Sequence, residues 1–191
     1  MLTVEANAAE VERRLMGGGL VCPDCGGVLA PWGWARARVL RGGSGAVAVH
    51  PRRARCEECG VSHVLLPVFA LLRRADLAEV IGSALALKAS GAGARAIAAG
   101  LGRAVDTVRG WLRRFSGRAR VVRAVFTLVL VDIGVEPALP APAATGFADA
   151  VSAVVGAWVA ACSRWPDIVE VSPWRLACAA TGGQLLAPSW P

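Results

Sequence analysis

The chain has 191 residues, of which 55% are hydrophobic and 18% charged; this composition excludes bulk disorder and allows one large core or two small ones. The formal net charge of +7 is uneven, because residues 1–123 hold 19 of the 21 Lys and Arg residues and 9 of the 14 Asp and Glu residues. All but one of these cations are arginines, which suit phosphates and base edges, although RNA, anionic membranes and acidic proteins are compatible with the same charge.

The N-terminal segment, residues 1–20, is expected to form a helix. It lacks the basic start and apolar core of a secretory signal, so we expect a cytoplasmic protein. The most apolar run, residues 124–131, lies between two charged residues and falls well short of the ~20 residues that a spanning helix needs, so no membrane partner is expected. In a reducing compartment the six cysteines are metal ligands or small core residues rather than disulfides.

Two C-x-x-C motifs, each followed by Gly, stand in VCPDCGG and RCEECG, with 30 residues between them. Two residues between thiolates let both sulfurs reach one ion from a tight turn, and the glycine lets that turn close. A redox C-x-x-C needs no second copy, so we predict one structural Zn²⁺ with four ligands: Cys22, Cys25, Cys56 and Cys59. Four thiolates leave no open coordination position for catalysis.

Other side chains stand beside these motifs. His63 follows Cys59 by four residues, and we expect it to make a structural hydrogen bond rather than to bind the metal. Three arginines beside the second motif can offset the thiolate charge or contact phosphate: Arg52, Arg53 and Arg55.

Residues 21–69 are predicted to form a zinc ribbon. Between the cysteine pairs, two extended segments flank a Gly-Gly-Ser-Gly turn. Four side chains alternate onto one face: Trp32, Trp34, Arg36 and Arg38. Such a face can bind nucleic acid, but we favour a role for both tryptophans in covering the core of so small a module.

Residues 70–118 are predicted to form a helix-turn-helix domain, with helices over residues 75–91, 94–102 and 103–115. Gly102 is expected to make the turn, and small Ala98 allows the helices to approach. Five apolar residues are expected to point inward: Ile97, Leu101, Val105, Val108 and Trp111.

The outward face of the third helix is basic, whereas a merely solvated face usually mixes charge signs. The N-terminal part of a recognition helix meets base edges in the major groove, which predicts readout by Arg103, Asp106, Thr107 and Arg109, with close approach at Gly110. Phosphate contacts are predicted for Arg95, Arg113 and Arg114. We therefore predict double-stranded DNA as the partner; a trihelical fold that binds protein is the alternative.

The segments CPDCGG, PWGWARAR, PRRARCEECGVSHVLLP, LLRRADLAEVIG and IAAGLGRAVDTVRGWLRRF resemble a family of uncharacterised actinobacterial proteins with a zinc ribbon followed by a helix-turn-helix. The resemblance covers about residues 8–135, and a similar pairing opens many insertion-sequence transposases. It implies DNA binding without an established activity, the same four cysteine ligands, and a recognition helix over about residues 104–115. Ala104 departs from the related motifs, which often place Pro or Ser near this helix start.

Residues 119–191 are predicted to form a helical C-terminal region with a Pro-rich linker at 136–144. Residues 118–135 look apolar all round and hence buried. A second stripe at helical spacing comprises Phe147, Val151, Val154, Val155, Trp158, Val159, Cys162 and Trp165. This stripe closes the chain's own core or makes a homodimer, and we favour the former. Cys162 and Cys178 are expected to be small buried hydrophobes.

No enzymatic activity, catalytic residue or small-molecule substrate is predicted. Two-metal phosphoryl transfer needs carboxylates that converge on a rigid scaffold. The last third of the chain has no run of predicted strands to carry its five acidic residues: Asp132, Glu136, Asp149, Asp167 and Glu170. A phosphate-cradling glycine loop and a catalytic serine motif are also absent from the sequence.

The predicted fold class is mainly α with a small β zinc ribbon, in which a trihelical helix-turn-helix domain precedes a helical C-terminal region. The predicted function is sequence-specific DNA binding, as a transcriptional regulator or a transposase-related DNA-binding protein. The alternative is a protein-protein adaptor that uses the zinc ribbon and the basic helix without DNA readout. RNA binding is a weaker third option, because the stacking motifs of the usual RNA modules are missing.

Overall fold

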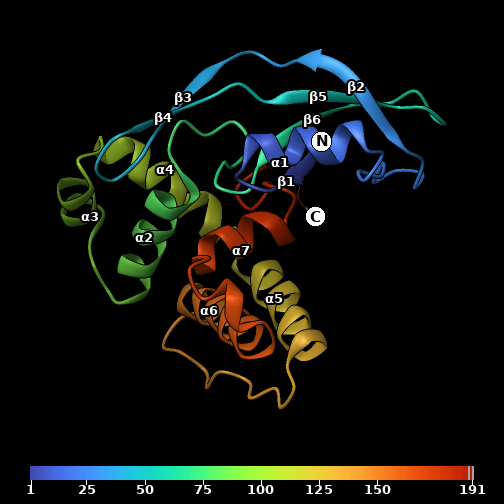
Figure 1. The fold of residues 1–191 in the computed structure, drawn as a ribbon. Helices are drawn as coiled ribbons and strands as arrows, with labels where there is room; N and C mark the ends of the chain where they lie inside the picture. The colour runs from blue at the N-terminus through green and yellow to red at the C-terminus, as the bar shows by residue number, and fades with distance from the viewer. Residues whose placement is uncertain (189, 191) are drawn as a thin grey trace.

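The computed structural model describes residues 1–188 and 190, and it joins a β-sheet region to a helical body (Figure 1). The strands are β1 (Leu2–Val4), β2 (Leu29–Trp34), β3 (Arg38–Arg41), β4 (Ala46–Val49), β5 (Arg52–Cys56) and β6 (Ser62–Pro67). The helices are α1 (Ala8–Met16), α2 (Ala78–Ala89), α3 (Ala94–Leu101), α4 (Val105–Ser116), α5 (Ala119–Ile133), α6 (Gly146–Arg164) and α7 (Pro173–Ala180), with a short 3₁₀ turn, η1 (Pro166–Ile168).

The larger sheet is mixed, with strand order β1-β6-β5-β2. Strand β1 runs parallel to β6, and the other pairs in this sheet are antiparallel. Strands β3 and β4 form a separate antiparallel hairpin around the Gly-Gly-Ser-Gly segment, as predicted. The expected helical content is confirmed, but the prediction of a helix over residues 1–20 is wrong at its start, because residues 2–4 form a strand that pairs with one some sixty residues away. The sheet is therefore larger than a ribbon alone.

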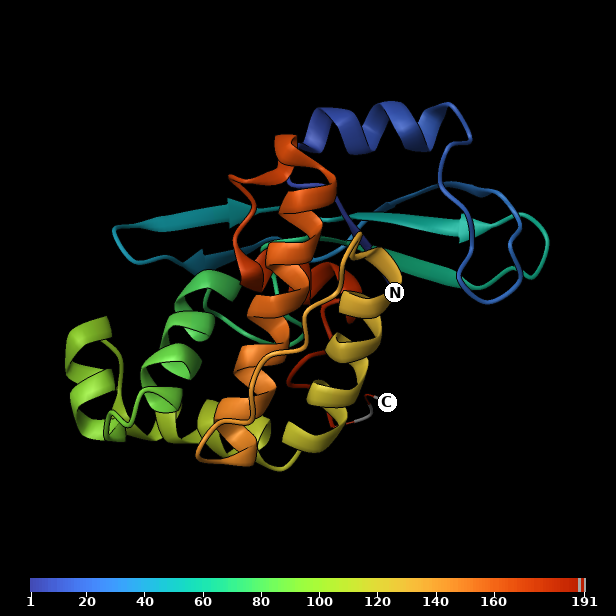
Figure 2. The same ribbon diagram turned by 90° about the horizontal axis from the view of Figure 1, so that it is seen from below.

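Helix α1 lies alongside the larger sheet, next to β2 (Figure 2). The carboxamide oxygen of Asn7 accepts hydrogen bonds from the backbone N–H groups of Ala9 and Glu10, which caps the helix start. Val11 and Leu15 point into a buried cluster with sheet residues and with two of the cysteines. The sheet region thus has a small core of its own.

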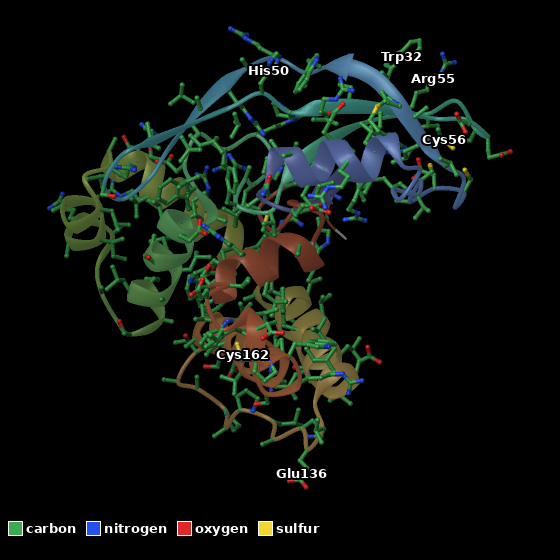
Figure 3. All side chains as sticks on the ribbon, viewed as in Figure 1. Trp32, His50, Arg55, Cys56, Glu136 and Cys162 are labelled. Atoms are coloured by element: carbon green, nitrogen blue, oxygen red, sulfur yellow. The ribbon has the colours of Figure 1, made fainter. Side chains whose placement is uncertain are left out.

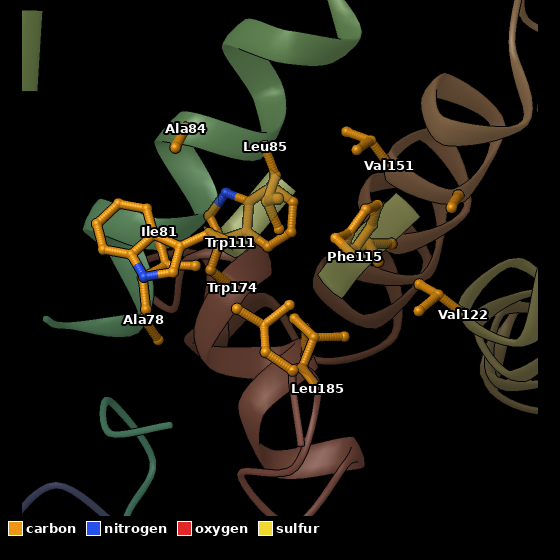
Figure 4. Packing of buried hydrophobic residues seen from close by; sticks show 14 of the residues in the cluster. Ala78, Ile81, Ala84, Leu85, Trp111, Phe115, Val122, Val151, Trp174 and Leu185 are labelled. Carbon is orange, nitrogen blue, oxygen red and sulfur yellow. The ribbon is translucent and has the colours of Figure 1, made fainter. Parts of the chain in front are cut away.

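Helices α2 to α7 share a second, larger core (Figure 4). Ile81 and Leu85 of α2 lie beside Trp111 of α4, and Phe115 packs toward Val151 of α6. The C-terminal helices therefore pack intramolecularly, as favoured from the sequence. The predicted boundary between residues 118 and 119 does not coincide with a break in this core.

Two expectations about the C-terminal helices are wrong. Helix α5 is not buried all round, because Leu128 is 69% exposed and Val131 is 50% exposed. The predicted stripe on α6 is only partly buried, since Val155, Val159 and Trp165 are exposed. The buried face of α6 is instead rich in alanine, and these small side chains let α5 and α6 pack closely. Cys178 is buried as expected, whereas Cys162 is half-buried.

Within the part of the chain that the structure describes, α6 is the one helix whose length and composition would allow it to cross a membrane. Its buried residues belong to the same core as α2, α4 and α5, and it packs extensively against α5. A core helix meets the same criteria of length and apolar character.

Helix α7 packs closely against α2 at Gly82. A Cβ atom at this position would lie 1.9 Å from Cγ of Trp174, which is 8% exposed. We expect Gly82→Ala to destabilise the protein by about 1–3 kcal/mol, because Trp174 has to move within a packed core. Urea unfolding measures this effect.

Gly100 in α3 provides a matched control, since an added Cβ meets nothing within 4 Å there. Gly100→Ala should leave stability unchanged or raise it by up to about 1 kcal/mol through helix propensity. Equal unfolding midpoints for the two variants would contradict the close approach of α7 to α2.

Candidate metal centre and basic surface

The four predicted ligands Cys22, Cys25, Cys56 and Cys59 come together, with all four sulfurs within 4.8 Å of one another. The Sγ atoms of Cys25 and Cys56 are 3.4 Å apart, and those of Cys22 and Cys59 are 3.8 Å apart. A tetrahedral zinc site with Zn–S bonds of about 2.3 Å places its sulfurs about 3.8 Å apart. The cluster is therefore consistent with a single zinc site.

Both cysteine pairs are held by the same backbone turn. In the first, the N–H of Gly26 donates to the carbonyl of Cys22 at 2.9 Å; in the second, Gly60 donates to Cys56 at 3.1 Å. Both glycines have positive φ, 78° and 71°, where a side chain would be strained. The repeated C-x-x-C-G pattern thus encodes two copies of one turn.

The four thiols are chemically unequal. A hydrogen bond from the Cys59 backbone N–H is the main cause that lowers the pKa of Cys56 to about 7. At Cys25, an amide hydrogen bond from Gly27 lowers the pKa, but hydrogen bonds with the neighbouring thiols and burial outweigh it and raise the pKa to about 12. Such crowded sulfurs resist ionising together, and a divalent cation supplies the charge that four thiolates require.

His63 is buried beside this cluster and makes a structural hydrogen bond, as predicted. Its Nε2 lies 3.4 Å from Sγ of Cys22, and its Nδ1 lies 3.0 Å from the amino nitrogen of Met1. A neutral imidazole carries one N–H donor and one acceptor nitrogen, which suits it to bridge these two groups. Burial lowers the pKa of His63 and favours this neutral form. The imidazole thereby orients Cys22.

The expectation that Trp32 and Trp34 cover the ribbon core is wrong, because each is 53% exposed. Val11 and Leu15 of α1 fill the place that the tryptophans were expected to occupy. The expected alternation along the strand also fails, since β2 contains a register shift between Pro31 and Trp34. A bulge of this kind re-aims the side chains that follow it.

The arginines beside the second cysteine pair have different partners. Arg52 is paired with Glu12 of α1, with Nε 2.8 Å from the carboxylate, and its guanidinium lies over the ring of Trp34. Arg55 donates to the carbonyl of Gly60 and lies over the other tryptophan. Arg53 donates to the Ser62 hydroxyl. Among the described residues, neither Arg53 nor Arg55 has a carboxylate partner.

Helices α3 and α4 occupy the segments predicted for the second and third helices. Gly102 ends α3 in the left-handed conformation, with φ 62°, and makes the turn as expected. Ala104 precedes α4 without a side-chain cap. Of the predicted inward residues, Ile97, Val108 and Trp111 are buried and the other two are half-buried against the core.

The residues predicted to contact DNA differ in exposure. Arg95, Arg109, Arg113 and Arg114 are exposed, as is Asp106, whereas Thr107 and Gly110 are half-buried. Arg109 lies 3.2 Å from the Asp106 carboxylate, and Arg114 donates to the carbonyl of Gly110 at 3.0 Å. Within the described part of the chain, Arg113 has no carboxylate partner.

Arg103 departs from the prediction that it reads DNA. Its side chain is 11% exposed, and its Nε donates to Asp76 at 2.6 Å. A second guanidinium nitrogen donates to the carbonyl of Gly42 in the β3–β4 turn at 2.6 Å. These contacts join the start of α4 to the hairpin, so Arg103 acts as a structural clamp.

Asp76 is the residue of this clamp that sequence reasoning missed. Its carboxylate is 2% exposed and also accepts from Arg41 at 2.7 Å. A lone aspartate before a helix is ordinarily read as a helix cap. Its two partners are 35 and 27 residues away, and no local pattern points to them.

Comparisons of the chain with protein-family models, curated proteins and solved structures gave no match. The resemblance to zinc-ribbon and helix-turn-helix proteins therefore stays a prediction. The function has to be argued from the residues of the metal centre and of the basic helices.

Proposed function

We propose that this protein binds double-stranded DNA sequence-specifically, with one structural Zn²⁺ in its ribbon and α3 and α4 as a helix-turn-helix. In this proposal it acts in the cytoplasm as a transcriptional regulator or a transposase-related DNA-binding protein, by occupying DNA rather than by catalysis. The observation that carries the proposal is the set of exposed arginines on α3 and α4 that lack carboxylate partners among the described residues: Arg95, Arg113 and Arg114.

The distribution of charge supports a polyanionic ligand. A helix surface that is merely solvated pairs its arginines with acidic side chains, but among the arginines of α3 and α4 only Arg109 has such a pair within the described residues. Burial lowers the pKa of Arg74, and the positive charge of Arg114 lowers it further. A phosphate would relieve this repulsion through charge-assisted hydrogen bonds.

The shape of α4 supports a division of roles. The B-DNA major groove is about 12 Å wide and admits one helix. Asp106, Thr107 and Arg109 lie in the first half of α4, where a recognition helix meets base edges, and Gly110 adds no bulk. Arg113 and Arg114 lie a turn later, nearer the phosphates. Arg103 holds this helix in place through Asp76 and is not among the residues that we propose to contact bases.

A second candidate function is protein binding, which the exposed apolar side chains of α5 favour: Val121, Leu128 and Val131. This face could also join two copies of the chain. Binding through it would survive high salt and substitution of Arg109, whereas DNA binding through the arginines would not.

The division of roles predicts different results for two substitutions. Arg113→Ala should weaken binding to all duplex sequences and reduce the salt dependence by about one phosphate contact. Arg109→Ala should weaken binding to the preferred sequence by about 5- to 150-fold and relax the preference. Fluorescence anisotropy with matched and scrambled duplexes over a salt series measures both.

Arg164→Ala is the matched control, since Arg164 is an exposed arginine at the far end of α6. It should bind DNA like the unsubstituted protein. Equal losses from all three substitutions would mean that only net charge matters, and equal effects of the two α4 substitutions would refute the division of roles.

A further inference from the structure

The side of the larger sheet opposite α1, called the outer face below, carries Trp32, Arg53, Arg55 and Val64. Ala54 lies between the two arginines in β5 and is fully buried in the cluster that includes α1. Because strand side chains alternate, the two arginines point the other way. Val64 lies opposite Arg53 in the neighbouring strand and shares this face.

Trp32 forms an exposed aromatic platform on the outer face. The guanidinium carbon of Arg55 lies 4.9 Å from the centre of its ring, and the Nε of Arg55 is itself fixed by the carbonyl of Gly60 at 3.0 Å. Figure 3 shows Trp32 and Arg55 together at the end of the sheet that carries Cys56. An indole so exposed contributes little to the core and is free to stack on a planar ligand.

A hollow of about 590 Å³ opens on the same face and includes Val64 in its lining. Leu66 and Leu72 give it an apolar floor, and Arg36 and Arg38 supply positive charge. Burial lowers the pKa of Arg38, which reflects the low polarity of the site. The hollow thus combines the volume and apolar surface of a base site with cationic walls.

The arginines of this face have unused hydrogen-bonding capacity. The side chains of Arg36 and Arg38 make no hydrogen bond within the described residues, and Arg53 makes one, to the Ser62 hydroxyl. Across residues 1–188 and 190, none of Arg36, Arg38, Arg53 and Arg55 forms a salt bridge. Two oxygens of a phosphate group form the bidentate acceptor that a planar guanidinium fits.

We propose that the outer face binds a single strand of nucleic acid, with one base stacked on Trp32, phosphates on Arg53 and Arg36, and a neighbouring base in the hollow. Bases in a duplex are stacked on one another, so only an unpaired strand offers a ring face to the indole. The proposal deepens the proposed nucleic-acid function but uses a surface separate from α4. The protein would hold an unpaired strand beside a duplex.

Trp34 lies outside this site. It pairs with Arg52 across the strands, on the side of the sheet where α1 lies, and Arg52 is bound to Glu12. The ring of His50 lies 4.8 Å from that of Trp34. This second exposed tryptophan is therefore engaged by its own neighbours.

The test measures anisotropy of fluorescein-labelled dT12 and U12 with the zinc-loaded full chain. Trp32→Ala should weaken binding about tenfold, as expected for loss of one stacked base, and Trp32→Phe should retain most of it. Trp165→Ala is the matched control, because Trp165 is 46% exposed and also lies beside an arginine. Retained zinc and an unchanged far-UV spectrum establish that Trp32→Ala folds.

Two variants distinguish a failure of this inference from a failure of the proposed duplex binding. Trp32→Ala should bind duplex DNA like the unsubstituted protein. Arg113→Ala should bind duplex DNA more weakly while its affinity for dT12 is unchanged. Binding of either U12 or dT12 supports the site, and the tighter of the two shows whether it prefers the ribo-uridine or the deoxythymidine strand. Absence of binding to both oligonucleotides, or equal affinities of Trp32→Ala and Trp165→Ala, would overturn the inference.

Discussion

Removal of zinc should unfold the β-sheet region around the four cysteines. The core of this region is small, with Val11, Leu15 and a few sheet residues packed around two of the ligands themselves. Structural zinc in small modules contributes about 10–16 kcal/mol of apparent binding free energy, which is more than so few buried side chains supply. Chelation should therefore lower the thermal unfolding midpoint sharply and remove the near-UV signal of the ribbon tryptophans.

Cys56→Ser tests the same centre without a chelator. We expect this variant to bind no stoichiometric zinc, whereas Cys162→Ser, which alters a half-buried cysteine outside the cluster, should keep one zinc ion per chain. Elemental analysis together with thermal unfolding measures both. An unchanged unfolding midpoint after complete chelation would contradict a structural metal centre.

Substitution of Asp76 should have the second large effect. Its carboxylate is the shared partner of Arg41 and Arg103, and the Arg103 side chain is only 11% exposed. Asp76→Asn removes the charge but keeps the shape, and it leaves two guanidinium groups facing a neutral amide. Breaking a buried ion pair in this way costs about 3–5 kcal/mol, which we expect to see in urea unfolding.

Asp106→Asn is the matched control for this substitution. The Asp106 side chain is 93% exposed and, within residues 1–188 and 190, pairs only with Arg109, so its loss should change stability by less than about 1 kcal/mol. A stability loss at Asp76 no larger than the loss at Asp106 would contradict the clamp between the hairpin and α4. The contacts of Asp76 would then not stabilise the position of α4 against the hairpin.

Features encoded within short stretches of the sequence could be predicted. The two C-x-x-C-G motifs each carry the glycine that their turn requires, so the clustering of the four cysteines followed from spacing alone. Helices α3 and α4 have well-defined apolar spacing, and the glycine at position 102 readily adopts the left-handed conformation of the turn between them. These predictions needed no knowledge of distant neighbours.

Features that depend on distant contacts could not be predicted. The pairing of β1 with β6, and the partners of Asp76, arise only once the chain has folded. The role of Trp32 depended on whether another element fills the ribbon core, and α1 does so. Likewise, the exposed face of α5 looked like core because apolar character alone does not reveal which face receives a neighbour.

Selection of binding sites from random duplex DNA with the zinc-loaded protein, repeated at rising salt, tests the central claim most directly. The proposed function predicts an enriched motif that persists at about 0.15 M salt and is lost in Arg109→Ala. If the protein retains duplex DNA without enriching any motif, and this retention disappears as salt rises, the arginines contact only phosphates. No retention of duplex DNA at any salt would contradict the proposed function.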